Sequence, residues 1–170
     1  MTAARRALLP LALLAALPAG AQDSLELDAV EVSGGVYEVL RAADVAEGGF
    51  ELHGRAVPLP HLPRFVPALV PMAGLMATGD GALYAYAGFG LDFALTERFT
   101  VTPSWAFGAY DEGEGRDLGG VVEFRSALDL AYRLGERAAI GLSFYHLSNA
   151  GLYDLNPGSE SLVLTWRVGR

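Results

Sequence analysis

The stretch VEFRSALDLAYRL, residues 122–134, alternates between apolar and polar side chains with a period of two. One face of this segment carries Val122, Phe124, Ser126, Leu128, Leu130, Tyr132 and Leu134. The other face carries Glu123, Arg125, Asp129 and Arg133. Because successive side chains of a strand point to opposite faces, the pattern predicts a β-strand with one apolar and one polar face.

The same alternation occurs in the two preceding segments, residues 83–95 and 99–110. Strands of about twelve residues or more are long for a soluble β-sandwich, in which strands of five or six residues are typical. Tilted strands of this length suit a transmembrane barrel whose apolar side chains face lipid and whose polar side chains face the interior. The pattern therefore favours a membrane barrel over a sandwich.

We predict eight strands, which make an all-β, eight-stranded antiparallel transmembrane β-barrel of the outer-membrane type. The predicted strands are residues 29–40, 49–57, 67–78, 82–95, 98–110, 119–134, 137–149 and 160–169. The third segment contains Pro67 and Pro71 and lacks alternation, but an even number of strands requires it. Eight strands leave room only for side chains, so the interior is predicted to be a packed polar network and not a channel.

The connections between the predicted strands alternate in length. TER (96–98) and LGER (134–137) are short, whereas DEGEGRDLGG (111–120) and NAGLYDLNPGS (149–159) are longer and polar. Outer-membrane barrels have short periplasmic turns and longer extracellular loops. With both chain ends in the periplasm, the longer loops would lie outside the cell.

The first 21 residues have the pattern of a signal peptide. A basic MTAARR precedes the apolar ALLPLALLAALP, and the small residues AGA provide a cleavage site before Gln22. The apolar run is short for a membrane anchor, which is the alternative interpretation. Residues 22–170 would then form one barrel domain in the bacterial outer membrane.

Composition excludes several classes of function. Cysteine is absent, so disulfides, cysteine nucleophiles and thiolate metal sites are excluded. The formal charge is −8 and the chain has no lysine, which makes nucleic acid an unfavourable partner. His, Asp and Glu residues do not have metal-ligand spacing in the sequence, so we expect neither a metal ion nor another cofactor.

Polar residues gather between the last two predicted strands, in SFYHLSNAGLYDLNPGSESL, residues 143–162. By parity His146 and Ser148 continue the apolar, lipid-facing set of Ile140, Leu142 and Phe144. On the last strand Glu160 has the parity of the lipid-facing residues Leu162, Leu164, Trp166 and Val168. The sequence therefore predicts three polar side chains together on the lipid-facing surface, at the outer leaflet.

A serine, a histidine and a carboxylate in one patch are suited to ester cleavage. The imidazole accepts the serine proton, and the carboxylate orients and stabilises the imidazole. Side chains at i and i+2 of a strand lie about 7 Å apart at their bases, within hydrogen-bonding reach after the histidine bends over. The alternative is a polar rim whose side chains only meet lipid headgroups.

Two segments, His146-Leu147-Ser148-Asn149-Ala150 and Asn156-Pro157-Gly158-Ser159-Glu160, resemble the signature of the lipid A 3-O-deacylases, the PagL family. The resemblance implies an outer-membrane esterase that removes the 3-hydroxyacyl chain ester-linked at position 3 of lipid A. It implies that Ser148 is the nucleophile, His146 the base and Glu160 its partner. It also implies that Asn149, Gly151 and Asn156 position the substrate or contribute to an oxyanion hole.

The partners that the resemblance implies are lipid A, or lipopolysaccharide, as substrate and the surrounding outer-membrane lipid; a homodimer is left open. Two other functions compete with it: a noncatalytic barrel with a structural or surface-adhesion role, and a host-interaction protein built around its loops. The predicted outer loops are modest, and the one dense motif is of a catalytic type, so the esterase is favoured.

Overall fold

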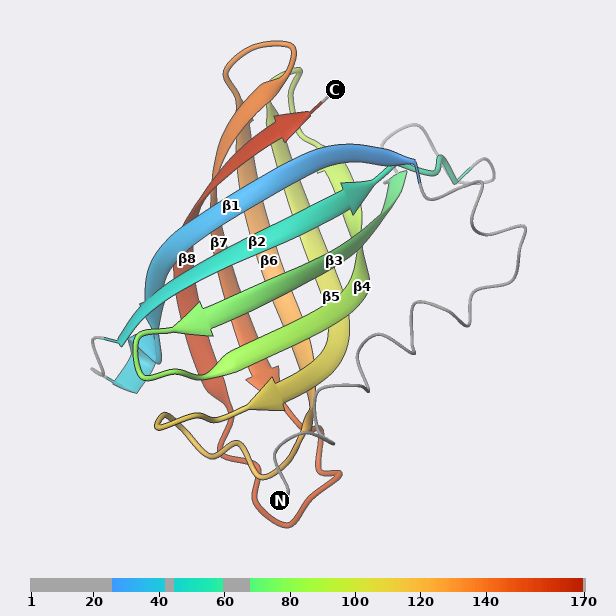
Figure 1. The fold of residues 1–170 in the computed structure, drawn as a ribbon. Coiled ribbons are helices and arrows are strands. Elements are labelled where there is room, and N and C mark those ends of the chain that lie inside the picture. The colour runs from blue at the N-terminus through green and yellow to red at the C-terminus, as the bar shows by residue number, and fades with distance from the viewer. Residues whose placement is uncertain (1–25, 42–44, 60–67, 170) are drawn as a thin grey trace.

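The computed structural model describes residues 26–41, 45–59 and 68–169, and the predicted signal peptide lies outside them. Eight antiparallel strands follow one another around a closed barrel in which β8 pairs with β1 (Figure 1). The strands are β1 (Leu27–Tyr37), β2 (Val45–Gly54), β3 (Ala68–Thr78), β4 (Leu83–Ala94), β5 (Phe99–Asp111), β6 (Val122–Arg133), β7 (Ala138–Ser148) and β8 (Ser159–Gly169). The predicted fold class and strand number are confirmed.

The largest difference from prediction lies in β2, whereas β3 lies within one residue of its predicted bounds. Strand β2 begins four residues earlier than predicted, at Val45, because pairing with β1 extends back to that residue. Strand β3 forms despite Pro71, which lies one residue beyond the end of the β2–β3 ladder at Met72. A proline without an N–H is tolerated where one side of the strand has no ladder partner.

Large apolar side chains cover the outer wall of the barrel, where the alternation places them. These exposed side chains come from different strands and include Val32, Leu75, Trp105, Leu128, Ile140 and Leu164. An exposed apolar surface of this extent is unfavourable in water and is matched by lipid. The outer wall is therefore built to face a membrane, as the sequence predicts.

The interior is a packed polar network around Arg125. This guanidinium is buried, lies over the Tyr145 ring at 4.5 Å and pairs with Asp129 at 3.9 Å. Its Nη atoms donate to the hydroxyls of Ser104 and Ser143. A cavity of about 20 Å³ beside these residues has room for about one water molecule. The interior around Arg125 is therefore filled by packed polar and aromatic side chains.

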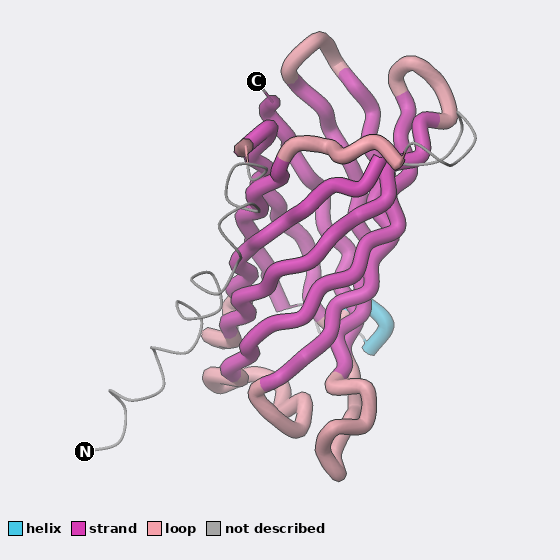
Figure 2. The backbone as a smooth tube through the Cα atoms, turned by 90° about the vertical axis from the view of Figure 1, so that its right-hand side faces the viewer, coloured by secondary structure: helices cyan, strands magenta, loops and turns pink. Residues whose placement is uncertain are grey.

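The two ends of the barrel differ, as Figure 2 shows. The β5–β6 and β7–β8 loops and the short 3-10 helix η2 (Val39–Arg41) lie at one end, the lower end in Figure 1. The short β4–β5 and β6–β7 turns lie at the other end, in agreement with the predicted loop pattern. Among the described residues no helix is long and apolar enough to cross a membrane.

Candidate active site

A histidine and a glutamate form a hydrogen-bonded pair on the outer wall, where β7 ends and β8 begins. His146 of β7 lies directly opposite Glu160 of β8, and its Nδ1 is 3.1 Å from Glu160 Oε1. The His146 side chain is 40% exposed and that of Glu160 is 19% exposed. With Nδ1 held by the carboxylate, Nε2 is the ring nitrogen left to exchange a proton with another group.

Ser148 is two residues beyond His146 on β7 and points to the same face. It is half-buried and lies opposite Phe124 of β6. Within the described part of the chain, the Ser148 hydroxyl has no hydrogen bond to His146. Catalytic hydrogen bonds are often long before substrate binds, so this separation is compatible with a nucleophile and base pair.

The His146 ring lies against Gly158, the residue before β8. A Cβ atom on Gly158 would be 2.6 Å from His146 Cε1 and 3.3 Å from Nε2. The backbone of Gly158 has a φ of 63°, a left-handed conformation that glycine adopts without strain. This glycine both turns the chain into β8 and leaves the space that the imidazole occupies.

Asn149 organises the loop that follows the serine. It is fully buried, and its side-chain Nδ2 donates to the carbonyls of Leu118 at 2.8 Å and Leu155 at 2.7 Å. Its Oδ1 accepts from the Gly151 N–H at 3.0 Å. Ala150 and Gly151 both have positive φ, and the Leu152 N–H donates to the Asn149 carbonyl, as in a type I′ turn. One side chain thus ties the β7–β8 loop to the β5–β6 loop.

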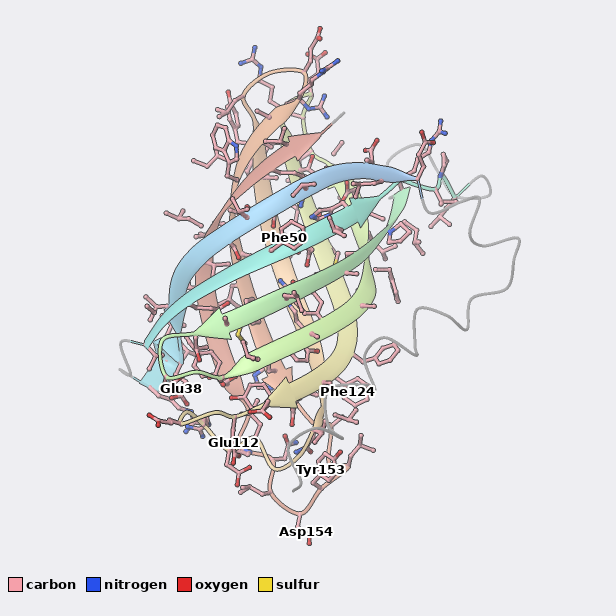
Figure 3. The ribbon with its side chains drawn as sticks, in the orientation of Figure 1. Glu38, Phe50, Glu112, Phe124, Tyr153 and Asp154 are labelled. Atoms are coloured by element: carbon pink, nitrogen blue, oxygen red, sulfur yellow. The ribbon has the colours of Figure 1, made fainter. Side chains whose placement is uncertain are left out.

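Asn156 holds the same loop from its far end. Its Oδ1 accepts from the Asn149 N–H at 3.1 Å, seven residues back along the chain. Tyr153 contributes a further contact, since its hydroxyl accepts from the Val122 N–H at the start of β6. Tyr153 and the nearby Phe124 both lie at the lower end of the barrel in Figure 3. The predicted positioning residues Asn149, Gly151 and Asn156 are therefore brought together beside Ser148.

A group with metal-ligand potential that the sequence did not predict lies inside the barrel. Glu31, Glu51 and His53 have ligand atoms within 4.8 Å of one another, and His53 Nε2 is 3.0 Å from Glu51 Oε1. Arg167 Nε donates to Glu31 at 2.9 Å and the Tyr86 hydroxyl to Glu51 at 2.8 Å. Because each carboxylate already accepts a hydrogen bond from another interior side chain, we interpret the group as part of the interior ionic network.

One further polar residue, not predicted as part of the site, lies beside the His146–Glu160 pair. Ser126 of β6 lies directly opposite His146, on the side away from Glu160. Its side chain is exposed on the outer wall. In the sequence, Ser126 is recognisable as a hydroxyl within the apolar set of residues 122–134. Its position next to His146, however, depends on the register of β6 against β7.

Comparisons with known proteins show the family and the fold of the chain. The family model described as lipid A 3-O-deacylase (PagL) matches residues 70–168, more than half of the chain. A crystal structure of the outer membrane enzyme PagL is similar, with a TM-score of 0.64 and 19% identity over 84% of this chain and 99% of that one. A de novo designed transmembrane β-barrel has a TM-score of 0.57 and 10% identity over 84% and 95% of the two chains. The comparison with curated protein sequences gives no match.

Proposed function

Because the chain belongs to the lipid A 3-O-deacylase (PagL) family, we propose that Ser148, His146 and Glu160 are the catalytic triad with which it removes the acyl chain at position 3 of lipid A. Membership makes the protein an ester hydrolase of the outer membrane that acts on lipid A. The observation that carries the triad is the His146–Glu160 hydrogen bond of 3.1 Å on the lipid-facing wall, two residues from Ser148.

In the proposed reaction the Ser148 Oγ attacks the ester carbonyl carbon while His146 Nε2 takes the hydroxyl proton. The tetrahedral intermediate then collapses, the bond to the sugar oxygen breaks, and His146 returns the proton to that oxygen. Water, deprotonated by the same imidazole, then attacks the acyl-serine carbonyl; the bond to Ser148 Oγ breaks, His146 returns the proton to Oγ, and a free 3-hydroxy fatty acid is released. Glu160 stabilises the imidazolium that exists in both transition states.

The oxyanion of the intermediate needs hydrogen-bond donors close to Ser148. We propose that the turn after β7 supplies them, with Asn149 and Asn156 holding that turn in place. The Gly151 N–H donates to Asn149 Oδ1 in the free protein. It would have to exchange this acceptor for the oxyanion to act as the donor.

Lipid A is proposed to approach sideways, from the outer leaflet. His146 and Ser148 lie on the lipid-facing wall near the end of the barrel that carries the longer loops. Below them the wall carries Phe144, Leu162 and Leu164, an apolar surface against which acyl chains can pack. The ester of lipid A lies at the headgroup boundary, and the position of Ser148 at the loop end of β7 supports a sideways approach.

The experiment is to compare lipid A from outer membranes containing the wild-type protein, Ser148→Ala or Ser33→Ala, by mass spectrometry. Ser33 lies on β1 with interior parity, away from the proposed site, and serves as the matched control. We expect loss of the position-3 acyl chain with the wild type and the control, and a drop of about a thousandfold or more in rate for Ser148→Ala. All three proteins should migrate as folded, heat-modifiable barrels. Undiminished deacylation by Ser148→Ala would reject the nucleophile, and unmodified lipid A with folded wild-type protein would favour the noncatalytic barrel.

A further inference from the structure

The outward-facing positions of the described strands hold very few polar side chains. Asp28 and Asp111 lie at strand ends, and Tyr132 is close to the end of β6 that is remote from the site. Apart from these and the indoles, the polar side chains at outward positions of the described strands are Ser126, His146, Ser148 and Glu160. Three of these four form the proposed triad, and the fourth is adjacent to it.

Ser126 is next to the triad and deeper in the membrane than the nucleophile. It pairs with His146 across the β6–β7 ladder, whereas Ser148 pairs with Phe124, two residues nearer the loop end of β6. The neighbouring outward residues of β6, Phe124 and Leu128, are large, apolar and exposed. Ser126 is therefore a small polar side chain between large apolar side chains of the outer wall.

The Ser126 hydroxyl has no hydrogen-bond partner within the described residues, and hydrocarbon chains cannot provide one. The His146 ring leans away from it, toward β8, because Nδ1 bonds Glu160 and Cε1 lies over Gly158. This orientation disfavours Ser126 as a second nucleophile. The hydroxyl instead faces the path of any acyl chain that runs from Ser148 into the membrane.

We propose that Ser126 is a specificity-determining residue that hydrogen-bonds the hydroxyl group carried by carbon 3 of the substrate's acyl chain. The inference rests on the proposed function, because that function places the scissile ester at Ser148. It makes this enzyme selective for acyl chains that are hydroxylated two carbons from the ester carbonyl. Ser126 and the substrate hydroxyl can each act as donor or acceptor.

The spacing of the two serines fits this chemistry. Ser126 and Ser148 are diagonal neighbours on an antiparallel pair, and side chains so placed lie about 7–8 Å apart at their Cα atoms and somewhat less at Cβ. A reacting carbonyl carbon lies about 3 Å from the attacking oxygen. Carbon 3 is a further ~2.5 Å along the chain, two C–C bonds away. A hydroxyl on carbon 3 of a chain descending the wall thus comes within hydrogen-bonding distance of Ser126.

The test uses the purified full-length protein and two synthetic lipid A molecules that differ only at position 3, one with a 3-hydroxytetradecanoyl chain and one with a tetradecanoyl chain. The quantity measured is the ratio of kcat/KM for the hydroxylated and the plain ester. For the wild type we expect a ratio of about three to ten, the size of one neutral hydrogen bond. Ser126→Ala should bring the ratio to about one, whereas Ser126→Thr, which keeps a hydroxyl, should retain the preference.

Tyr132→Phe is the matched control, because it removes another outward-facing hydroxyl from the same strand, six residues from Ser126. Its ratio should equal that of the wild type. Equal losses of kcat/KM on both esters in Ser126→Ala would reject the inference while leaving the proposed function intact. A wild-type ratio of kcat/KM near one would do the same. An active Ser148→Ala with an inactive Ser126→Ala would instead make Ser126 the nucleophile and overturn both proposals. Failure of the folded wild type on both esters would also reject both.

Discussion

Adding one methyl group at Gly158 should slow the reaction while leaving the barrel folded. The Cβ of an alanine there would lie 2.6 Å from His146 Cε1, whereas carbon atoms in contact are about 3.5–4.0 Å apart. The imidazole is the far end of a side chain and can retreat, so relief requires it to move by about 1 Å. Such a movement should strain its 3.1 Å hydrogen bond to Glu160 and shift Nε2 from its present position.

Misplacement of a catalytic group by about 1 Å can cost about a hundredfold in rate. We therefore expect kcat of Gly158→Ala to fall by about ten- to a hundredfold. KM should change little, because the acyl-chain surface of the wall is untouched. The substituted residue must also adopt a φ of 63°, which costs an L-residue about 1–2 kcal/mol of stability.

A second glycine provides a control that separates the backbone penalty from the collision with the imidazole. Gly81, in the β3–β4 turn, has a φ of 86°, and a Cβ there would have no atom within 4 Å. Gly81→Ala should thus lose a similar 1–2 kcal/mol of stability but keep its activity. The assay is release of the hydroxy fatty acid from lipid A, followed by mass spectrometry, with heat-modifiable migration as the test of folding. Wild-type kcat in Gly158→Ala, or equal losses in both variants, would refute the proposed contact between Gly158 and the imidazole.

Two further outcomes are expected. Leu162→Ala should alter the preference for acyl-chain length, since apolar contacts with the wall contribute about 25 cal/mol per Å² of buried area. The control Leu75→Ala, on the outward face of β3, should leave this preference unchanged. Equal effects of the two substitutions would argue against a chain groove beside the triad. Arg125→Ala should lower the free energy of unfolding, measured by urea titration, by about 3–5 kcal/mol, because it leaves buried carboxylates unpaired. The control Arg55→Ala breaks an exposed pair with Glu26 and should cost less than about 1 kcal/mol. Similar losses in the two variants would mean that the interior network contributes little to stability.

The local pattern of the sequence was sufficient to predict the barrel and the face on which the site lies. Alternation with a period of two is a property of neighbouring residues, so it identified strands such as β6 and placed His146 and Ser148 on the lipid-facing side. The same parity placed Glu160 with them, and the structure bears out this face for all three residues. The strand ends were less predictable, because β2 begins where pairing with β1 begins and not where the alternation is clearest.

Contacts between strands were decided by the tertiary structure. The register of β6 against β7 brings Ser126 next to His146, and closure of the barrel gathers Glu31, Glu51 and His53 in the interior. The close approach of Gly158 to the imidazole likewise depends on where β8 meets β7. A one-residue change of register would move every side chain of a strand to the other face without changing the sequence pattern. The sequence by itself determined which residues face lipid, and only the packing of strands distant in the chain determined which of them touch.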